Sequence, residues 1–283
     1  TLPQVLSISL GSLSAASCQL LCTEVIKQGF SQQDCHNFMQ QQRQVCMYLS
    51  ESQVEKISMA FQVLGVRGVS VFGSSGDGGS HWSFEPFPSS SAIGRALNKI
   101  GCEFQFPVFP TGSPYVTSVG GTTWRNGNSA DPVAWSGSGG GFAWQFPRPS
   151  FQDDAVSGYL KSTSQLPPST SYNASNRAYP DVSAISVEGT SESSPTVAGI
   201  FSLVVDHRLN AGLPPLGFLG PRLYKAMAAE PGSAFESVTE GNTKTTCDNG
   251  FPAATGWDPV TGWGRPRWEG ILKQFGSDAH IKR

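Results

Sequence analysis

Residues 69–79 read VSVFGSSGDGG, in which a short apolar strand opens directly into a glycine-rich loop. Ser52 and Glu55 fit a capping box for a helix upstream of this strand, with apolar residues at helical spacing as far as Gly68. A further strand is predicted at residues 5–10, where apolar and polar side chains alternate. Strand, helix and strand in this order predict a right-handed βαβ unit and a parallel sheet. The sequence therefore predicts an α/β fold with functional loops at the carboxyl ends of its strands.

The composition excludes several classes of protein. The 283 residues are 38% apolar, which is enough for a sizeable core, yet no stretch approaches about 18 consecutive apolar residues, so no membrane-spanning helix is expected. A net charge of −2 and a charged fraction of 14% argue against nucleic-acid binding and against intrinsic disorder. No repeat or sharp change of composition divides the chain, so residues 1–283 are expected to form a single domain. Residues 80–112, rich in Phe, Pro and Ser, are expected to be surface loops.

The cysteines indicate a secretory route. They are Cys18, Cys22, Cys35, Cys46, Cys102 and Cys247, and no Cys-x-x-Cys pair suggests a zinc ribbon or a thioredoxin-type site. An even number allows three disulfides in an oxidising compartment, and Asn173 begins an N-glycosylation sequon. Residues 12–49 hold four cysteines and are expected to form an inserted pair of helical pieces, broken near Gly29. Either these cysteines staple the pieces as a hairpin, or one disulfide lies beside two buried thiols; both interpretations remain open.

Residues 189–195 read GTSESSP and precede a long apolar helix predicted from Thr196 to about Leu209. Pro195 fits the first turn of a helix, where its missing N–H costs nothing. Ser191 is therefore expected at or next to a helix N-terminus. The exposed N–H groups and the positive end of the helix dipole favour an alkoxide or a tetrahedral oxyanion at such a position. On local grounds the serine could instead be only a helix cap, and both interpretations remain open.

The string GTSxxxP at the start of a buried helix resembles the nucleophile region of the subtilisin-like serine peptidases, which have two branches. The subtilisins themselves place a His base and an Asp in His-Gly-Thr-His and Asp-Thr-Gly contexts, and neither context occurs here. His207 lies on the helix after Ser191, about 24 Å away along its axis, where a structural role is expected. The other histidines are His36, His81 and His280.

Several further strings resemble the second branch, the sedolisin family of serine-carboxyl peptidases. Residues 75–79, SGDGG, follow a strand, at the place where that family has its oxyanion-hole aspartate. The remaining strings are residues 109–122 (FPTGSPYVTSVGGT), 138–142 (SGGGF), 177–183 (RAYPDVS) and 256–264 (GWDPVTGWG). All of them occur in the family's order along residues 1 to about 275.

The resemblance implies a subtilisin-like parallel sheet flanked by helices in three layers, and acid-active proteolysis of peptide or protein substrates. Ser191 would attack the scissile carbonyl, and Asp77, protonated at acidic pH, would donate a hydrogen bond to the oxyanion. Ser138, Gly139 and Gly140 would bind the substrate backbone. The family similarity further implies release of tripeptides from protein amino termini, a lysosomal or secreted location, and a propeptide that acts as a folding aid and inhibitor.

The general base is a departure from the family. The family's base is a Glu oriented by an Asp four residues later, on a helix upstream of the strand that begins at Val5. No Glu in this chain has an Asp four residues later, and only four residues precede Val5. Two alternatives remain open. The sequence is an N-terminally incomplete piece of an enzyme, or it is a non-catalytic, peptide-binding relative that lacks the base.

The resemblance also implies one calcium ion in a C-terminal region, residues 235–275. Its expected ligands are Ser237, Val238, Ala254, Gly256 and Asp258, with Ser237 standing where the family has a second carboxylate. Fewer carboxylates generally mean weaker calcium binding, although a shift in register could bring in Glu236.

The similarity further brings Cys102 and Cys247 together as a disulfide. The stretch between Pro180 and Gly189 is shorter than the family leads us to expect, which affects the shape of the pocket.

Overall fold

A computed structural model describes residues 3–13, 15–41, 49–81, 88–127, 131–187, 189–245 and 247–278. Its centre is a five-stranded sheet made of β1 (Val5–Ile8), β3 (Ser70–Ser74), β5 (Thr117–Trp124), β6 (Pro132–Ala134) and β9 (Val182–Ile185). Strands β1, β3, β5 and β9 pair in parallel, and β6 joins β5 antiparallel. The predicted α/β fold with a parallel sheet is therefore confirmed.

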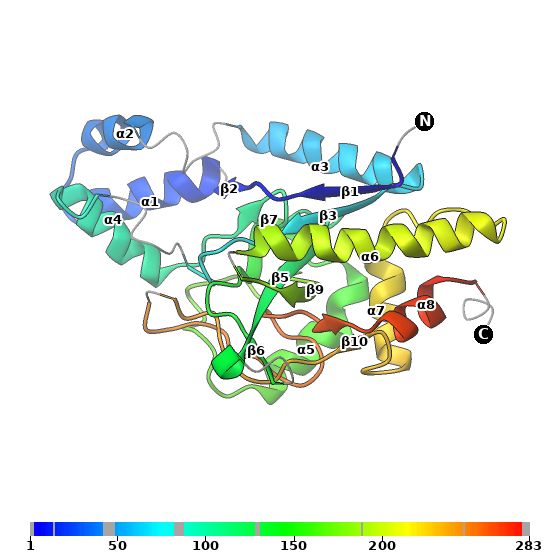
Figure 1. The fold of residues 1–283 in the computed structure, drawn as a ribbon. Coiled ribbons are helices and arrows are strands. Elements are labelled where there is room, and N and C mark those ends of the chain that lie inside the picture. Colours follow the sequence, from blue (N-terminus) through cyan, green and yellow to red (C-terminus); the bar gives the residue numbers. More distant parts are fainter. Residues whose placement is uncertain are drawn as a thin grey trace.

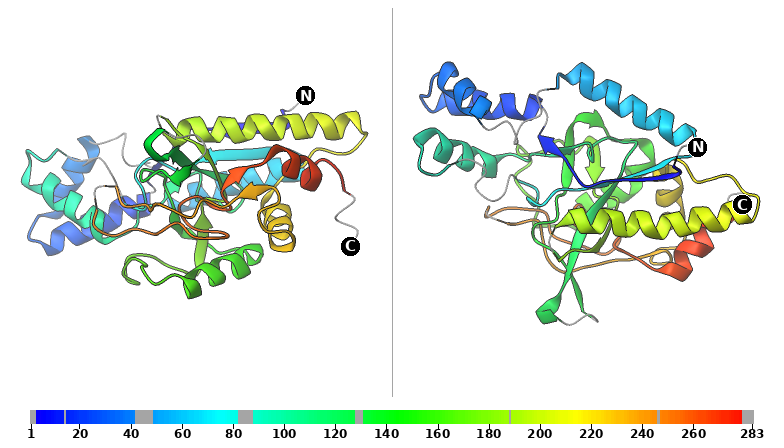
Figure 2. Two further views of the ribbon diagram at one scale, coloured as in Figure 1. Left: turned by 60° about the horizontal axis from the view of Figure 1, so that its bottom comes forward. Right: turned by 45° about the horizontal axis from the view of Figure 1, so that its top comes forward.

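Helices cover both faces of this sheet and give it three layers (Figures 1 and 2). Successive residues of β3 show which helix lies on which face, because side chains alternate along a strand. Val71 packs in a cluster with Phe61 and Leu64 of α3 (Glu51–Val66). Phe72 packs instead on Phe201 of α6 (Thr190–Asn210), with the ring centroids 5.3 Å apart. Helices α3 and α6 consequently lie on opposite faces.

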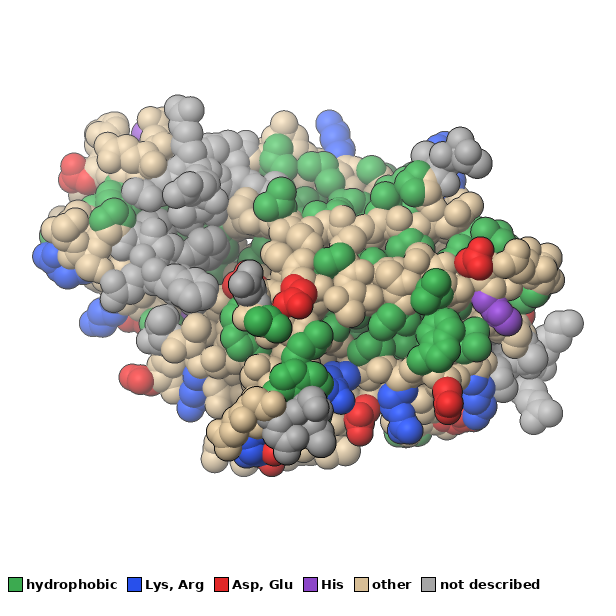
Figure 3. Space-filling model, in the orientation of Figure 1, with side chains coloured by type: hydrophobic (Ala, Val, Ile, Leu, Met, Phe, Trp, Pro, Cys, Tyr) green, Lys and Arg blue, Asp and Glu red, His purple; other side chains and the backbone are tan. Residues whose placement is uncertain are grey.

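Helix α6 starts earlier than the sequence suggests. It begins at Thr190 rather than Thr196, so Pro195 lies inside the helix and Ser191 lies in its first turn. The buried face carries Val197, Phe201 and Val204 at helical spacing, as an amphipathic helix on a sheet requires. Figure 3 shows the molecule from the side on which α6 runs, where hydrophobic side chains are scattered among uncharged ones.

A separate helical group stands at one end of the sheet (Figure 1). It comprises α1 (Ala15–Lys27), α2 (Gln32–Gln41) and α4 (Ala92–Glu103), whose apolar side chains share one buried cluster. A disulfide between Cys22 and Cys35 joins α1 to α2, which confirms the stapled hairpin for these two cysteines. Cys46 lies outside the described residues.

Two local predictions, for residues 92–103 and for the capping box of α3, are wrong. Residues 92–103 form helix α4 rather than a surface loop, because Ser91 caps a stretch in which Leu97 and Ile100 pack inward. The capping box of α3 uses Ser50 and Gln53 instead of Ser52 and Glu55. Ser50 has the extended backbone that a cap needs, whereas Ser52 already lies in the first turn.

The remaining elements connect and cover these layers. They are β2 (Ser12–Leu13), β4 (Val108–Phe109), η1 (Arg125–Gly127), β7 (Gly141–Pro147), η2 (Ser150–Gln152), α5 (Asp153–Ser162), β8 (Asn176–Tyr179), α7 (Gly220–Ala229), β10 (Phe235–Glu236), β11 (Arg265–Pro266) and α8 (Trp268–Phe275). Within the described ranges, no helix combines the length and apolar character needed to span a bilayer.

Candidate active site

Two loops from distant parts of the sequence meet at the carboxyl ends of β3 and β9. One carries Asp77, and the other leads into α6 at Thr190 and Ser191. The backbone N–H of Thr190 donates to Asp77 Oδ1 at 2.7 Å, and its hydroxyl donates to the same oxygen at 2.9 Å. The N–H of Gly76 in turn donates to the Thr190 hydroxyl at 3.1 Å. These bonds hold the aspartate beside the first turn of α6, next to Ser191.

Gly189 allows this close approach. Its φ of 126° lies in the region that favours glycine, and a Cβ on it would lie 2.8 Å from Asp77 Oδ2. Any larger residue would therefore push the aspartate away from the helix end. The glycine before Thr190 thus serves the geometry of the site as well as the start of α6.

Ser191 is joined to Ser9, just after β1, by two reciprocal hydrogen bonds. The Ser191 hydroxyl donates to the Ser9 carbonyl at 3.3 Å, and the Ser9 hydroxyl donates to the Ser191 carbonyl at 2.9 Å. The second bond has a clear cause. Pro195 has no N–H to donate to the carbonyl four residues earlier, so Ser191 needs another donor. Sequence reasoning did not identify Ser9, although a proline four residues after the serine is a signal that its carbonyl lacks a helical partner.

The Ser191 hydroxyl thus donates to a carbonyl and not to a base. Glu192, the neighbouring carboxylate, accepts the N–H of Val187 instead. Histidine His207 lies near the far end of α6, in agreement with the structural role expected for it. Over the part of the chain that the structure describes, no carboxylate or imidazole hydrogen-bonds to Ser191.

A cavity of about 390 Å³ opens in front of these residues. Its lining includes Ser9, Asp77, His81, Thr190 and Ser191, so the two predicted catalytic residues share one pocket. The volume is within the range of cavities that take small ligands or parts of a peptide. The arrangement places a hydroxyl, a carboxyl group and a helix N-terminus around one space, and such groups can supply a nucleophile and stabilise an oxyanion in acyl transfer.

The glycine-rich loop expected to bind the substrate backbone packs against the loop that carries Asp77. Ser138 is fully buried, donating to the Val260 carbonyl at 2.7 Å and accepting the N–H of Gly121 at 2.9 Å. The N–H of Gly139 donates to the Gly76 carbonyl at 2.8 Å, and Gly140 is buried beside it. Ser138, Gly139 and Gly140 are not among the residues that line the cavity, and the bond from the Gly139 N–H to the Gly76 carbonyl supports the loop that carries Asp77.

In the C-terminal region, Asp258 is fully buried. Its carboxylate accepts the N–H groups of Ala254, Val260 and Thr261 and the Thr261 hydroxyl, at 2.8 to 3.3 Å. A carboxylate offers about four lone pairs, so these donors use its capacity. Burial nevertheless raises the pKa of Asp258 to about 7.

The residues expected to bind calcium do not fit the ion in this arrangement. The donors around Asp258 point hydrogens at the oxygens that calcium would need. The Ser237 hydroxyl is used as well, because it accepts the N–H of Gly256 at 3.1 Å. Val238 is buried, and Glu236 pairs with Arg265 at 3.6 Å. In the described ranges, no group of three His, Cys, Asp or Glu residues could hold a metal.

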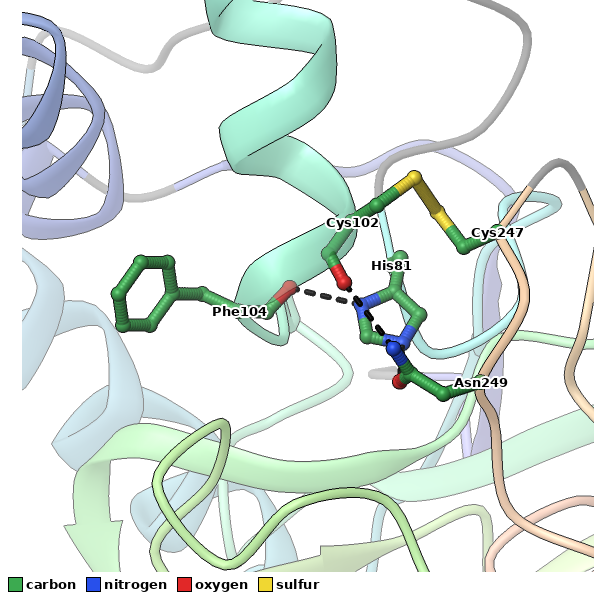
Figure 4. Close-up of a disulfide and its surroundings, with 5 residues drawn as sticks. All are labelled: His81, Cys102, Phe104, Cys247 and Asn249. Atoms are coloured by element: carbon green, nitrogen blue, oxygen red, sulfur yellow. Dashed lines mark hydrogen bonds between the residues drawn. A yellow bond between two sulfur atoms is a disulfide. The ribbon is translucent and has the colours of Figure 1, made fainter. Parts of the chain in front are cut away.

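The disulfide implied by the resemblance is present. Cys102 and Cys247 are bonded, with their Cα atoms 5.3 Å apart, and join the end of α4 to the loop that precedes Phe251. Figure 4 shows this bond beside His81, which lies between the two chain segments. Asn173, the expected glycosylation site, is exposed on a turn. No sequence pattern assigned His81 to the site, although the structure places it in the wall of the same cavity as Ser9 and Asp77.

Three comparisons place these observations among known proteins. No protein-family model matches the chain. Tripeptidyl-peptidase 1 of Bos taurus is 40% identical over 247 residues, and that of Homo sapiens is 39% identical over 251 residues. Each match covers 80% of this chain and 40% of the relative, so the chain spans about two fifths of the relatives' length. Pseudomonas sedolisin, a serine-carboxyl proteinase solved with pseudo-iodotyrostatin, matches 99% of this chain and 65% of its own, with a TM-score of 0.63 and 22% identity.

Proposed function

We propose that Ser191 is the nucleophile and Asp77 the oxyanion aspartate of a serine-carboxyl peptidase. The premise is that the chain belongs to the sedolisin family of such enzymes. Its relatives are named tripeptidyl-peptidase 1, which supports removal of tripeptides from the amino termini of polypeptides. The observation that carries the proposal is the contact between Asp77 and Thr190, which sets a carboxyl group beside Ser191 in one cavity.

In the proposed reaction, the Ser191 oxygen bonds to the carbonyl carbon of the scissile peptide, and its proton passes to a general base. A protonated Asp77 donates a hydrogen bond to the oxygen that becomes negative. The carbon–nitrogen bond then breaks, and the base returns the proton to the leaving amine. Water later releases the peptide from the serine ester by the same steps in reverse order.

We propose that the base is a carboxylate supplied by a segment outside these 283 residues. The Ser9 carbonyl that accepts from Ser191 cannot take up a proton at any relevant pH, so it positions the hydroxyl without activating it. A carboxylate stays ionised at an acidic pH where a histidine would be protonated, which suits an acid-active enzyme. The same observation favours the alternative function, a peptide-binding relative without catalysis.

Calorimetric titration with a tripeptide aldehyde at pH 4.5 tests the nucleophile. A serine adds to the aldehyde carbon as it would to a peptide, so Ser191→Ala should weaken binding at least about tenfold. Ser202→Ala is the matched control, since Ser202 is an exposed serine on the same helix. Equal binding by the parent chain and Ser191→Ala would favour the peptide-binding alternative. No measurable binding by either protein would contradict both functions.

We further propose that the protein works in the lysosome or outside the cell. Support comes from the disulfides Cys22–Cys35 and Cys102–Cys247, which persist in oxidising compartments, and from the exposed sequon at Asn173. The proposal assigns no step to calcium, because the expected ligands do not fit the ion. A propeptide stays a proposed partner on the strength of the family alone.

A further inference from the structure

A second cavity, of about 400 Å³, lies apart from the candidate active site. It is bounded by α3, the turn before β5, the end of β7 with η2, and the segment before α7. Over the part of the chain that the structure describes, its lining has no residue in common with that of the cavity at Ser191. The proposed peptidase reaction uses none of the residues around it.

Aromatic and proline side chains make up most of the lining of this second cavity. The aromatic members are Tyr115, Phe146, Phe151 and Phe218, and three prolines accompany them. Cavities of this volume with such a lining are typical binding sites for small organic ligands. Aromatic rings also attract cations, because their faces carry partial negative charge.

Contacts within the protein fix the walls of the cavity. The ring of Phe218 meets those of Tyr115 and Phe151 at steep angles, with centroids 5.8 and 5.9 Å apart. A Cβ on Gly65 of α3 would lie 2.8 Å from the Cβ of Phe218, so the helix packs directly on this segment. Because the rings hold one another, the space between them is preformed and costs little to fill.

The cavity has two charged side chains in its lining, Glu55 and Arg148. Arg148 is already paired: its Nε donates to Asp153 Oδ1 and its Nη1 to the Ala174 carbonyl, both at 2.8 Å. Glu55 is exposed, and in the described ranges no side chain forms an ion pair or hydrogen bond with its carboxylate. The lining therefore presents one negative charge that the protein does not balance.

The rim of the cavity is open to solvent on the side of α3. Met59, one helical turn after Glu55, lines the cavity and is 61% exposed. A methionine side chain adapts to the shape of a ligand, and its sulfur packs well against aromatic rings. A ligand could therefore place an apolar body among the rings while a charged group stays at the rim near Glu55.

We propose that this cavity binds a small organic cation that has an aromatic or branched alkyl body and one ammonium group. The body packs among the aromatic rings, and the ammonium group lies beside the Glu55 carboxylate. A neutral ligand of the same shape keeps only the apolar contacts, and an anion is repelled by Glu55. The site is separate from the proposed peptidase reaction and involves no covalent step.

An NMR titration at pH 7 with three probes of one shape tests this inference. The probes are 2-phenylethylammonium, 2-phenylethanol and 3-phenylpropanoate, which share a phenyl ring and differ in charge. The ammonium should bind with a Kd on the order of 1 mM, about fivefold more tightly than the alcohol, and the carboxylate should bind most weakly. Nuclear Overhauser effects from the probe ring to the Met59 methyl group and the Tyr115 ring should locate it in this cavity.

Two variants and a control separate the charge from the apolar walls. Glu55→Gln should lower the affinity for the ammonium to that for the alcohol, about fivefold, and leave the alcohol unaffected. Phe146→Leu should weaken all three probes by at least about threefold, because each packs on the same rings. Glu103→Gln removes an exposed carboxylate on α4, outside this lining, and should change nothing.

Equal affinities for the ammonium and the alcohol would overturn the inference, and so would a failure of all three probes to bind. Overhauser effects to Thr190 without any to Met59 would also contradict it, because they would place the probe in the active-site cavity. Unchanged ammonium binding by Glu55→Gln would do the same, and this variant alters only an exposed side chain. Loss of aldehyde binding in the earlier titration does not affect these results, so the two proposals fail separately.

Discussion

Asp77 and Asp258 both hold a loop by accepting backbone N–H groups, but one lines an open cavity and the other is sealed in the interior. Asp77 accepts two donors from Thr190, and Asp258 accepts donors from three residues around it. The family resemblance gives a role to both. The comparison teaches that the surroundings of a carboxylate decide its role: an aspartate beside a cavity can meet a substrate, whereas one enclosed by donors organises its own loop.

The largest effect expected from this difference is on stability. Asp258→Ala leaves the N–H groups of Ala254, Val260 and Thr261 without their acceptor, which should lower the free energy of unfolding by about 4 to 5 kcal/mol at pH 5. Asp77→Ala removes a half-buried acceptor at a helix end and should cost about 1 kcal/mol. Urea unfolding of both variants measures the contrast. Equal losses would remove the distinction between the two aspartates.

The pH dependence of stability should follow Asp258. Burial raises its pKa from 3.8 to about 7, so the folded state binds the proton more tightly than the unfolded state. The resulting stability is fully present below about pH 4 and is lost as the pH rises through about 7, by up to about 4 kcal/mol. The free energy of unfolding should therefore fall between pH 4 and pH 8 in the parent chain and change less with pH in Asp258→Asn. Parallel slopes in the two proteins would place the effect elsewhere.

A smaller effect is expected at the junction between Asp77 and α6. Gly189→Ala puts a Cβ where the Asp77 carboxylate lies, in a backbone region that alanine rarely adopts, and should cost about 2 kcal/mol. Gly199→Ala, in the middle of the same helix with open space around it, should instead stabilise by up to about 1 kcal/mol. Thermal unfolding of the pair gives the difference. If Gly189→Ala leaves the stability unchanged, the Asp77 loop and α6 do not lie as close together as described.

The smallest expected effect concerns calcium. Because the oxygens of Asp258 already accept four hydrogens, addition of millimolar CaCl₂ should change the free energy of unfolding by less than about 0.5 kcal/mol relative to EDTA. Differential scanning calorimetry at pH 5 makes the comparison. A rise in the melting temperature that saturates with calcium would show that the loop rearranges to bind the ion.

Much of the fold followed from short sequence patterns. The strand and glycine-rich loop at residues 69–79 and the long apolar helix after the serine were predicted from the residues alone, whereas the placement of Asp77 beside Ser191 came from the family resemblance. The pairing of Cys102 with Cys247 came from the family resemblance, and the structure bears it out.

The sequence did not reveal the hydrogen bonds in which the two partners lie far apart along the chain. The bond from Ser9 to the Ser191 carbonyl exists because Pro195 leaves that carbonyl unpaired, and the partner comes from a strand end 182 residues away. The hydroxyl of Ser138 pairs with two backbone groups inside the protein, and no pattern along the chain identified these partners. Patterns along the chain show which residue types are present, whereas the satisfaction of each hydrogen bond is decided by neighbours that are distant in sequence.

The order of strands in the sheet has a consequence for biosynthesis. The central strand β5 ends at Trp124, but the helix that covers it and carries Ser191 begins only at Thr190. A ribosome therefore releases β3 and β5 well before their apolar faces can be covered, and every parallel pairing must wait for a distant segment to emerge. Parallel sheets with such long connections fold slowly and pass through intermediates whose exposed apolar surface makes them prone to aggregation. The nascent chain is accordingly expected to need chaperones during translation, and ribosome-bound chains stalled before residue 190 should bind them more than chains stalled after residue 210.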